Sequence, residues 1–252
     1  MKKIVLSGCN GRMGRVISRV ISDTSDIEIV AGIDVNTAST DNYPIYSKPL
    51  DFDGEADVII DFSHPSALSP ILKLAISKKI PAVIATTGLS STQIEELKEA
   101  SKIIPIFFSA NMSLGVNLII ELAKKAATIL YSNFDIEIIE KHHNQKLDAP
   151  SGTAMLIADE ISASLPIEPQ YTFDRHSQRK KRDKNEIGIH AIRGGTIVGE
   201  HEIIFAGLDE IVEIKHSAMS KEIFATGAIR AAIYLSEQKA GLYNMSNIVA
   251  FE

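Results

Sequence analysis

The sequence predicts an α/β protein, with a doubly wound parallel sheet in one domain and a second, α+β domain whose sheet is mostly antiparallel. In the first part of the chain, short apolar runs alternate with segments of helical periodicity, which is typical of βαβ units. Beyond residue 111 this alternation stops, and three strand-like segments follow one another without a helix between them. We therefore expect one domain at 1–113 and 223–252 and another at 114–222.

The expected elements of the first domain follow from its hydrophobic pattern. Runs such as "KKIVLSG" are short, apolar and bounded by turn residues, as buried parallel strands are. Ser91, followed by Glu95 and Glu96, favours the start of a helix because acidic side chains stabilise the first turn. The expected strands are 2–8, 27–35, 56–63, 80–88 and 103–111, and the expected helices are 12–23, 64–79 and 90–102.

The second domain has a different pattern. "FDIEIIEKHH" alternates apolar and polar residues, which predicts a strand with one face in solvent. The helix at 221–238 is expected to return to the first domain, because chain termini often lie close together. The other expected elements are helices at 115–130 and 151–165 and strands at 134–143, 186–195, 196–207 and 210–218.

Composition and charge exclude several classes of protein. The chain has 252 residues, 45% of them hydrophobic and 23% charged, which suits a soluble globular protein. A net charge of −6 argues against general nucleic-acid binding. The single cysteine, Cys9, excludes an intrachain disulfide and a cysteine-rich metal site. The apolar run at 4–6 is too short for a signal peptide and no run could span a membrane, so we expect a cytoplasmic protein.

A glycine-rich turn predicts a nucleotide site. Gly8, Gly11 and Gly14 lie between an expected strand and an expected helix, the context of a Rossmann-like dinucleotide fingerprint, although the spacing is GxxGxxG rather than GxGxxG. Glycine lets the backbone approach a pyrophosphate, and the helix N-terminus favours its charge. Asp34 ends the second strand, where a carboxylate accepts hydrogen bonds from ribose hydroxyls.

The residues around Asp34 bear on the choice of cofactor. The carboxylate repels a 2′-phosphate, and the following Val35 and Asn36 bring no cation, so we expect NADH to be preferred over NADPH. Arg12 could still reach a phosphate, which would make the preference modest. Cys9 lies in the same turn, where a helix N-terminus lowers a thiol pKa, but a small residue in a tight space explains it as well.

A second motif, "EKHHNQKLDAPSGTA", combines histidines, a lysine and a helix start. His142 and His143 are adjacent on an expected strand and point to opposite faces, so they do not share a metal, and Lys146 opposes a cation. Ser151 lacks the G-x-S-x-G turn of a serine hydrolase. We expect no metal and no nucleophilic serine in this segment.

Anion binding and proton transfer fit the same residues better. Ser151 is a good N-cap, and the N–H groups of Gly152 and Thr153 can hold a carboxylate together with the charge of Lys146. A histidine next to this site can donate a proton near neutral pH. The structural alternative is that His143 caps a strand and that Lys146 is solvated.

The motif "EKHHNQKLDAPSGTA" resembles the signature of the 4-hydroxy-tetrahydrodipicolinate reductase family, also called dihydrodipicolinate reductases, of the lysine and diaminopimelate pathway. The segments "GCNGRMGR", "DFSHP", "ATTG", "SANMSLGVN", "IHAIRGG" and "HSAMSKEIFATGAIRAA" agree in order, so the resemblance spans nearly the whole chain. It implies that NAD(P)H reduces a cyclic dicarboxylate, with loss of water, addition of hydride and uptake of a proton. It also implies a dinucleotide-binding domain, a substrate-binding and oligomerisation domain, and a homotetramer.

The resemblance also implies residue roles. His142 matches the proton donor and acceptor, and Lys146 a second proton donor close to the substrate carboxylate. His143, Ser151, Gly152 and Thr153 match the substrate site. The residues that match cofactor contacts are Gly8, Cys9, Asn10, Gly11, Arg12, Met13, Asp34, Ala85, Thr86, Thr87, Ser109, Ala110, Asn111 and Met112.

Two positions depart from the family pattern. Ala85 stands where the family usually has glycine, and Met112 where it has a phenylalanine near the nicotinamide. Ala85 adds a methyl group near the cofactor and leaves contacts through its backbone possible. Neither position belongs to the proton-transfer set.

The remaining features have more than one explanation. The basic segment 174–186 is expected to be a solvated loop, with substrate steering or a nucleic-acid patch as alternatives. Arg193 is expected to support the substrate pocket or a sheet turn, and His190, His201 and His216 to be structural. Two other functions stay open: another NAD-dependent reductase of small amino or keto acids, and a non-catalytic NADH-binding sensor, which would not need His142 or Lys146.

Overall fold

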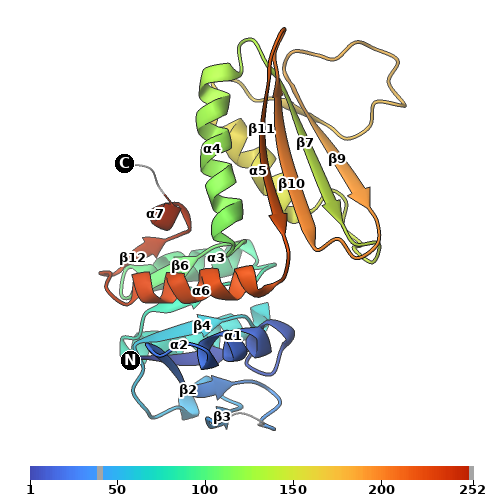
Figure 1. Cartoon of the computed structure of the whole chain (residues 1–252). Helices are drawn as coiled ribbons and strands as arrows, with labels where there is room; N and C mark the ends of the chain where they lie inside the picture. The colour runs from blue at the N-terminus through green and yellow to red at the C-terminus, as the bar shows by residue number, and fades with distance from the viewer. Residues whose placement is uncertain (39–41, 250–252) are drawn as a thin grey trace. The chain divides into compact units, whose positions relative to one another are not determined.

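The chain forms two compact units in the computed structural model, which describes residues 1–38 and 42–249. Unit 1 comprises Met1–Leu114 and Lys221–Glu252, and unit 2 comprises Gly115–Ser220. The helix after unit 2 therefore returns to unit 1, as its position near the C-terminus predicts. Figure 1 shows the elements of each unit along the chain.

Within the described residues, unit 1 is built on a seven-stranded sheet in which every pairing is parallel. The chain passes from β1 outward to β2 and β3, then returns to the other side of β1 with β4 and continues outward. This reversal creates a topological switch point beside β1, where ligands bind in doubly wound sheets. The strands are β1 (Lys2–Ser7), β2 (Ile27–Ile33), β3 (Ile45–Tyr46), β4 (Val58–Asp61), β5 (Ala82–Ile84), β6 (Pro105–Phe108) and β12 (Gly241–Tyr243).

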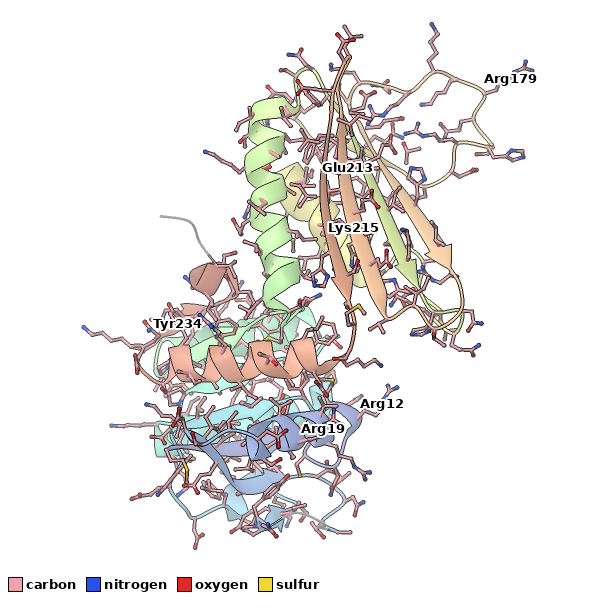
Figure 2. All side chains as sticks on the ribbon, in the orientation of Figure 1. Arg12, Arg19, Arg179, Glu213, Lys215 and Tyr234 are labelled. Carbon is pink, nitrogen blue, oxygen red and sulfur yellow. The ribbon has the colours of Figure 1, made fainter. Side chains whose placement is uncertain are left out.

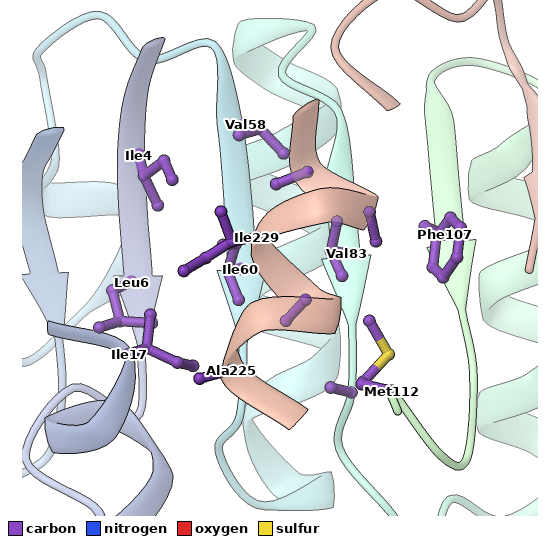
Figure 3. Packing of buried hydrophobic residues seen from close by; sticks show 14 of the residues in the cluster. Ile4, Leu6, Ile17, Val58, Ile60, Val83, Phe107, Met112, Ala225 and Ile229 are labelled. Carbon is purple, nitrogen blue, oxygen red and sulfur yellow. The ribbon is translucent and has the colours of Figure 1, made fainter. Parts of the chain in front are cut away.

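Helices cover both faces of this sheet because successive strand residues point to opposite sides. Ile4 and Leu6 of β1 pack with Ile17 and Ile229 on the face of α1 (Arg12–Ser22) and α6 (Glu222–Leu235), as Figure 3 shows. Val5, between them, belongs to a separate cluster on the other face. That face is covered by α2 (Leu68–Lys78) and α3 (Ser91–Ser101). The doubly wound α/β prediction is thus confirmed.

Unit 2 contains a five-stranded sheet, counted over the described part of the chain, in the order β11-β10-β7-β9-β8. The sheet is mixed rather than mostly antiparallel: β10 pairs antiparallel with β7 and β11, whereas β9 pairs parallel with β7 and β8. The chain passes through α5 between β7 and β9, and such a crossover makes strands parallel. The elements are α4 (Leu114–Leu130), β7 (Asp135–His142), α5 (Gly152–Ser164), β8 (Gln170–Thr172), β9 (Glu186–Arg193), β10 (Gly199–Ala206) and β11 (Ile211–Ala218).

The faces of this mixed sheet differ, as the alternation in β7 predicts. Ile136 and Ile138 of β7 are buried with Ile203 and Phe205 of β10 in one cluster with α4 and α5. The residues between them are more exposed along β7. Side chains at positions of the same parity as Ile136 therefore point toward the helices.

A few details differ from the sequence predictions. α3 begins at Ser91, and its N-cap is the preceding Ser90, whose Oγ accepts from the Gln93 N–H while the Gln93 side chain accepts from the Ser90 N–H. The short strands β3, β8 and β12 and the last helix, α7 (Ser246–Val249), were not predicted. None of the helices in the described ranges is long and apolar enough to cross a membrane.

Candidate active site

The glycine turn of unit 1 leaves room only for glycine at two positions. Gly8 has a φ of +76°, and a Cβ there would lie 2.6 Å from the carbonyl oxygen of Phe62. A Cβ on Gly14 would lie 2.2 Å from the carbonyl oxygen of Gly8. The turn therefore closes tightly against the start of α1. Its N-cap, Gly11, brings no side-chain oxygen to the first-turn N–H groups, so these donors can bind a phosphate.

A cavity of about 410 Å³ lies at the carboxyl ends of β1, β2 and β4. Its lining includes Gly8 and Gly11 from the turn and Asp34 from the end of β2. Ser7 also lines it, and its Oγ is buried without a hydrogen-bond partner among the described residues. An orphaned hydroxyl and a backbone cradle at a topological switch point fit the phosphate and ribose of a dinucleotide.

Asp34 holds the turn and the loop after β2 together. Its carboxylate accepts from the backbone N–H groups of Asn10 and Asn36, each at 3.0 Å. The Asn10 side chain donates in turn to the carbonyl oxygens of Asn36 at 2.6 Å and Ala38 at 3.0 Å. A carboxylate has about four acceptor positions, so Asp34 can still accept from ribose hydroxyls. Arg12 is exposed and extends away from unit 1 (Figure 2).

The other predicted cofactor residues follow β5 and β6. Ala85, Thr86 and Thr87 follow β5, and Thr86 Oγ1 donates to Asp61 Oδ2 at 2.6 Å. Asp61 is fully buried at the end of β4 and also accepts from Ser63 Oγ at 2.6 Å. The sequence reasoning missed Asp61, which fixes two loops beside the cavity.

The segment after β6 carries the last four predicted cofactor residues, and Cys9 and Met13 belong to the glycine turn and the first turn of α1. Ser109 Oγ donates to the carbonyl oxygen of Asn111 at 2.8 Å, which tightens this loop around Ala110. Met112 and Cys9 are buried in the core cluster of unit 1. The packing of Cys9 agrees with a small residue in a tight space. Met13, in the first turn of α1, is partly buried against the same cluster.

In unit 2, β7 brings Glu140 and His142 to the same face, because residues two apart on a strand point the same way. Glu140 is fully buried, and its Oε2 lies 2.6 Å from His142 Nδ1. The sequence reasoning missed Glu140. The sequence did contain a signal for its burial, because the alternation along β7 places Glu140 on the same face as the inward-facing Ile136 and Ile138.

Glu140 is the centre of a hydrogen-bond network. Arg193 donates to both of its oxygens, from Nη1 at 2.8 Å and from Nη2 at 2.7 Å. The Ser151 N–H donates to Oε1 at 3.0 Å. One carboxylate therefore connects the candidate proton donor, an arginine of β9 and the start of α5. Arg193 lies there because it is opposite His142 in the β7–β9 register.

The start of α5 already holds a carboxylate, that of Asp148. Asp148 Oδ1 lies 2.9 Å from Lys146 Nζ. The hydrogen bond from Lys146, and a smaller contribution from the Gly152 N–H, hold the pKa of Asp148 below its usual range. Ser151 caps the helix, since its Oγ accepts from the Ala154 N–H at 3.1 Å. Lys146 and the Gly152 N–H, two of the donors predicted for an anion, therefore lie at one carboxylate.

Three histidines lie on neighbouring strands of unit 2. The rings of His142 and His201 meet edge to face with centroids 5.3 Å apart, and His201 is opposite His216 in the β10–β11 register. His201 Nε2 lies 3.1 Å from Ser151 Oγ. His201 and Arg193 therefore touch the candidate site, which the sequence left open for Arg193 and did not predict for His201. His143, by contrast, lies just beyond β7 and is partly exposed.

Burial lowers the pKa of each of these histidines and so favours the neutral ring. Burial is the largest cause that lowers the pKa of His142, and Lys146 and Arg193 add to it, while Glu140 acts in the opposite direction. Burial, followed by the charge of His142, lowers the pKa of His201 to about 4. His201 Nε2 and Ser151 Oγ share a hydrogen bond in which either atom can be the donor, and Ser151 Oγ also accepts from the Ala154 N–H.

The basic segment 174–186 is partly fixed by ion pairs. Arg182 donates to Glu137 at 2.9 Å and to Asp135 at 2.9 Å, and Arg175 pairs with Glu137 and Glu186. These contacts attach its ends to β7 and β9, whereas Arg179 extends into solvent (Figure 2). Among the described residues, no cluster of three or more histidine, cysteine or acidic side chains could hold a metal ion.

Comparison with known families identifies relatives over the whole chain. The family model "Dihydrodipicolinate reductase, N-terminus" matches residues 2–112, and "Dihydrodipicolinate reductase, C-terminus" matches residues 115–249. A 4-hydroxy-tetrahydrodipicolinate reductase of Caldanaerobacter subterraneus subsp. tengcongensis is 52% identical over 249 residues, covering 99% of this chain and 98% of the relative. One of Clostridium tetani is 51% identical over 245 residues, covering 97% and 96%.

Solved structures share the fold. The dipicolinate-bound dihydrodipicolinate reductase of Paenisporosarcina sp. TG-14 superposes with a TM-score of 0.85 at 24% identity, covering 98% of this chain and 99% of that chain. A myo-inositol dehydrogenase of Corynebacterium glutamicum reaches a TM-score of 0.60 at 16% identity, covering 96% and 90%. At these identities, the likeness concerns the fold alone.

Proposed function

The chain belongs to the dihydrodipicolinate reductase family, and from that premise we propose which residues carry out its reaction. The reaction is the nicotinamide-dependent reduction of 4-hydroxy-tetrahydrodipicolinate to tetrahydrodipicolinate in lysine and diaminopimelate biosynthesis. One observation carries the proposal: a buried carboxylate joins His142 to the start of α5, where Lys146 and Gly152 already hold a carboxylate.

Unit 1 binds the cofactor in the cavity beside β1. The Gly8–Gly14 turn and the α1 N-terminus hold the pyrophosphate, and Asp34 accepts from the adenosine ribose. The bound cofactor supplies a hydride. The residues after β5 and β6, Ala85–Thr87 and Ser109–Met112, form the remaining contacts, with Met112 contributing through its backbone because its side chain is in the core.

NADH is the preferred cofactor. Asp34 is anchored by two backbone N–H groups, so its charge cannot swing away from a 2′-phosphate. Arg12 is exposed beside the turn and offsets part of this repulsion. An Asp34→Ala variant should therefore gain relative efficiency with NADPH, measured as the ratio of kcat/KM for the two cofactors. An unchanged ratio would remove Asp34 from cofactor selection.

Unit 2 binds the dicarboxylate substrate at the start of α5. One substrate carboxylate replaces that of Asp148 on Lys146 Nζ and the Gly152 N–H and also accepts from the Thr153 N–H, with Ser151 capping the helix behind them. His143, partly exposed beside this site, contributes a further donor. The helix N-terminus and the lysine suit an anion because both present positive charge.

His142 supplies the proton that accompanies the hydride. Its Nδ1 faces Glu140, so its Nε2 is the nitrogen available to the substrate. Burial favours the neutral ring, which makes the protonated ring a stronger acid. Lys146 serves as a second donor close to the carboxylate. Together, loss of water, addition of hydride and this proton convert substrate to product.

The assembly and location predicted from the sequence complete the proposal. Unit 1 serves as the dinucleotide-binding domain, and unit 2 as the substrate-binding and oligomerisation domain of a cytoplasmic homotetramer. Light scattering combined with size-exclusion chromatography gives the mass of the particle. A mass of one chain, 27.5 kDa, would contradict the tetramer.

A coupled assay tests the activity directly. A dihydrodipicolinate synthase generates the substrate from pyruvate and aspartate semialdehyde, and the absorbance of NADH is followed after this protein is added. We expect oxidation that depends on both proteins, and inhibition by dipicolinate, a planar dicarboxylate. Folded protein that binds NADH but oxidises neither NADH nor NADPH would favour a different small-acid substrate or a sensor.

A further inference from the structure

The buried carboxylate of Glu140 lies outside the residues to which the proposed function assigns a role. Within the described residues it receives four hydrogen bonds, from His142 Nδ1, the Ser151 N–H and two nitrogens of Arg193. Its exposed fraction is 0%. A buried carboxylate with this many donors stays ionised, because each donor stabilises the charged form and together they lower its pKa despite burial.

We propose that Glu140 is a positioning residue that keeps the proton of neutral His142 on Nδ1 and thereby directs Nε2 toward the substrate. An ionised carboxylate can only accept, so a nitrogen at 2.6 Å from it must carry the proton. In the neutral ring the other nitrogen then has a free lone pair. This inference rests on the proposed role of His142 as the proton donor.

The space around Nε2 agrees with this assignment. A Cβ built on Gly199 would lie 3.1 Å from His142 Nε2, so glycine leaves the ring edge uncrowded on the β10 side. The ring of His201 packs edge to face against His142 and limits its rotation. The ring is thus held at Nδ1 by a hydrogen bond and on one side by packing, while Nε2 has clearance.

Arg193 explains how Glu140 can hold the ring without making it a permanent cation. A lone buried carboxylate beside a histidine would stabilise the imidazolium. Here the two hydrogen bonds from Arg193 compensate the charge of Glu140, and Lys146 adds further positive charge near the ring. Burial lowers the pKa of His201 on β10 and of His216 on β11, which favours their neutral rings.

The proton balance of one turnover follows from this arrangement. Nε2 takes up a proton from solvent to form the imidazolium, and the N–H bond at Nε2 then breaks as the proton moves to the substrate. The pair of electrons of that bond returns to Nε2, and the ring is neutral again with its Nδ1 proton in place. Glu140 keeps its charge throughout, as the aspartate of a serine-protease triad does.

Nitrogen-15 NMR of histidine-labelled protein tests the tautomer without any turnover. The chain has seven histidines, and the His142→Gln variant identifies the signals of His142. We expect the ring of wild-type protein above its pKa to be protonated at Nδ1, and Glu140→Gln to shift it toward Nε2. A wild-type ring protonated at Nε2 would overturn the proposal, whether or not the variant folds.

Kinetics provides the second readout. Glu140→Gln should reduce kcat about 10- to 100-fold with a smaller change in the KM for NADH, in line with the loss of a residue that orients an acid–base histidine. In the pH profile of kcat for this variant, the alkaline limb should move to lower pH, because removal of a negative charge lowers the pKa of His142. Glu140→Asp, which keeps the charge, should recover part of kcat.

Glu137→Gln is the matched control, since Glu137 on the same strand also pairs with a histidine, His190, at 2.7 Å and with two arginines. It removes a comparable network on the other face of the sheet, so we expect a loss of stability with kcat and pH profile unchanged. Equal losses of kcat in Glu137→Gln and Glu140→Gln would reduce Glu140 to a structural role. Full activity of His142→Gln would instead refute the proposed function while the tautomer result still stood.

Discussion

The two candidate anion sites of this protein are both helix N-termini, but they are built in opposite ways. At the start of α1 the N-cap is Gly11, and the site is made of backbone that two tightly packed glycines bring close. At the start of α5 the N-cap is Ser151, and the donors of the site are Lys146 Nζ and the Gly152 N–H, next to the network of charged side chains around the buried Glu140. The first is shaped by steric necessity and the second by charge compensation.

This difference matches the two ligands. A pyrophosphate needs many short contacts around its oxygens, which backbone N–H groups supply if no Cβ intervenes. A substrate that must also receive a proton needs a titratable group near its carboxylate, and such a group must be held in one protonation state. We therefore expect changes at α5 to affect chemistry and pH dependence, and changes at α1 to affect cofactor affinity.

The largest expected effect is at α5. His142→Gln should reduce kcat about 10²- to 10⁴-fold, because a general acid is lost. The dissociation constant for NADH, measured by fluorescence or calorimetry, should remain within about twofold because unit 1 is unchanged. If NADH binding falls as much as kcat, the separation of the two sites' roles is wrong.

The second prediction concerns pH and separates the two units. The pKa of His201 is lowered from 6.5 to about 4 in the folded protein, so the folded state favours the neutral ring. The stability that depends on the neutral ring of His201 is fully present above pH 6.5 and is lost as the pH falls toward 4. The reason is that the unfolded chain then binds a proton at His201 that the folded chain does not bind. This loss amounts to about 3 kcal/mol in the free energy of unfolding.

Hydrogen exchange of β10 amides between pH 6.5 and 4, corrected for the intrinsic pH dependence of exchange, measures this effect. His201→Gln, whose side chain can still accept from Ser151 Oγ, should flatten the pH dependence in unit 2 and leave that of β1 amides in unit 1 unchanged. An equally steep dependence in the variant would mean that other groups cause the acid sensitivity.

How far the sequence predicted each site follows from the same contrast. Gly8 and Gly14 were recognisable because no other residue fits at these positions, so the turn requires glycines at a fixed spacing in the sequence. Lys146 and Ser151 were recognisable because they lie close together along the chain beside a helix start. In both cases the residues of the site lie within one short segment of the sequence.

Glu140 and its partners were not recognisable in the same way. Its burial follows from strand parity, but its pairing with Arg193 depends on β9 lying next to β7. The sequence analysis predicted a mostly antiparallel sheet but no strand order, and in the structure β7 lies between β9 and β10. The contact of His201 with Ser151 depends on the same arrangement, so sheet order is the information that the local pattern lacked.

The third prediction tests steric shaping at α1. Gly8→Ala places a Cβ 2.6 Å from the Phe62 carbonyl oxygen at a φ of +76°, so the turn must move. We expect the strain to cost about 1–3 kcal/mol in the free energy of unfolding. If the turn must return to its native shape to bind NADH, the same free energy appears as about a 5- to 150-fold loss of NADH affinity. Gly88→Ala is the control for stability, since Gly88 has the same φ with nothing within 4 Å. Equal destabilisation by both would show that φ, rather than crowding, dominates.

The smallest expected effect concerns Asp148 at α5. Its carboxylate lies on Lys146 and the Gly152 N–H, the donors proposed for the substrate, so the two anions compete. The side chain of Asp148 is 57% exposed, and exposed pairs are worth about 0.2–1 kcal/mol. Asp148→Asn should therefore strengthen the binding of dipicolinate about 1.4- to fivefold, measured by calorimetry, whereas Lys146→Ala should weaken it.

A change of net charge alone would also favour an anion, and Asp209→Asn controls for it, since Asp209 is an exposed acid elsewhere in unit 2. Only a gain in dipicolinate affinity larger than that of the control shows that Lys146 Nζ and the Gly152 N–H were released from Asp148. Weaker binding in Asp148→Asn would mean that Asp148 orients Lys146 for the substrate instead of competing with it. The start of α5 would then resemble the start of α1 more closely than we infer, with both shaped in advance for their ligands.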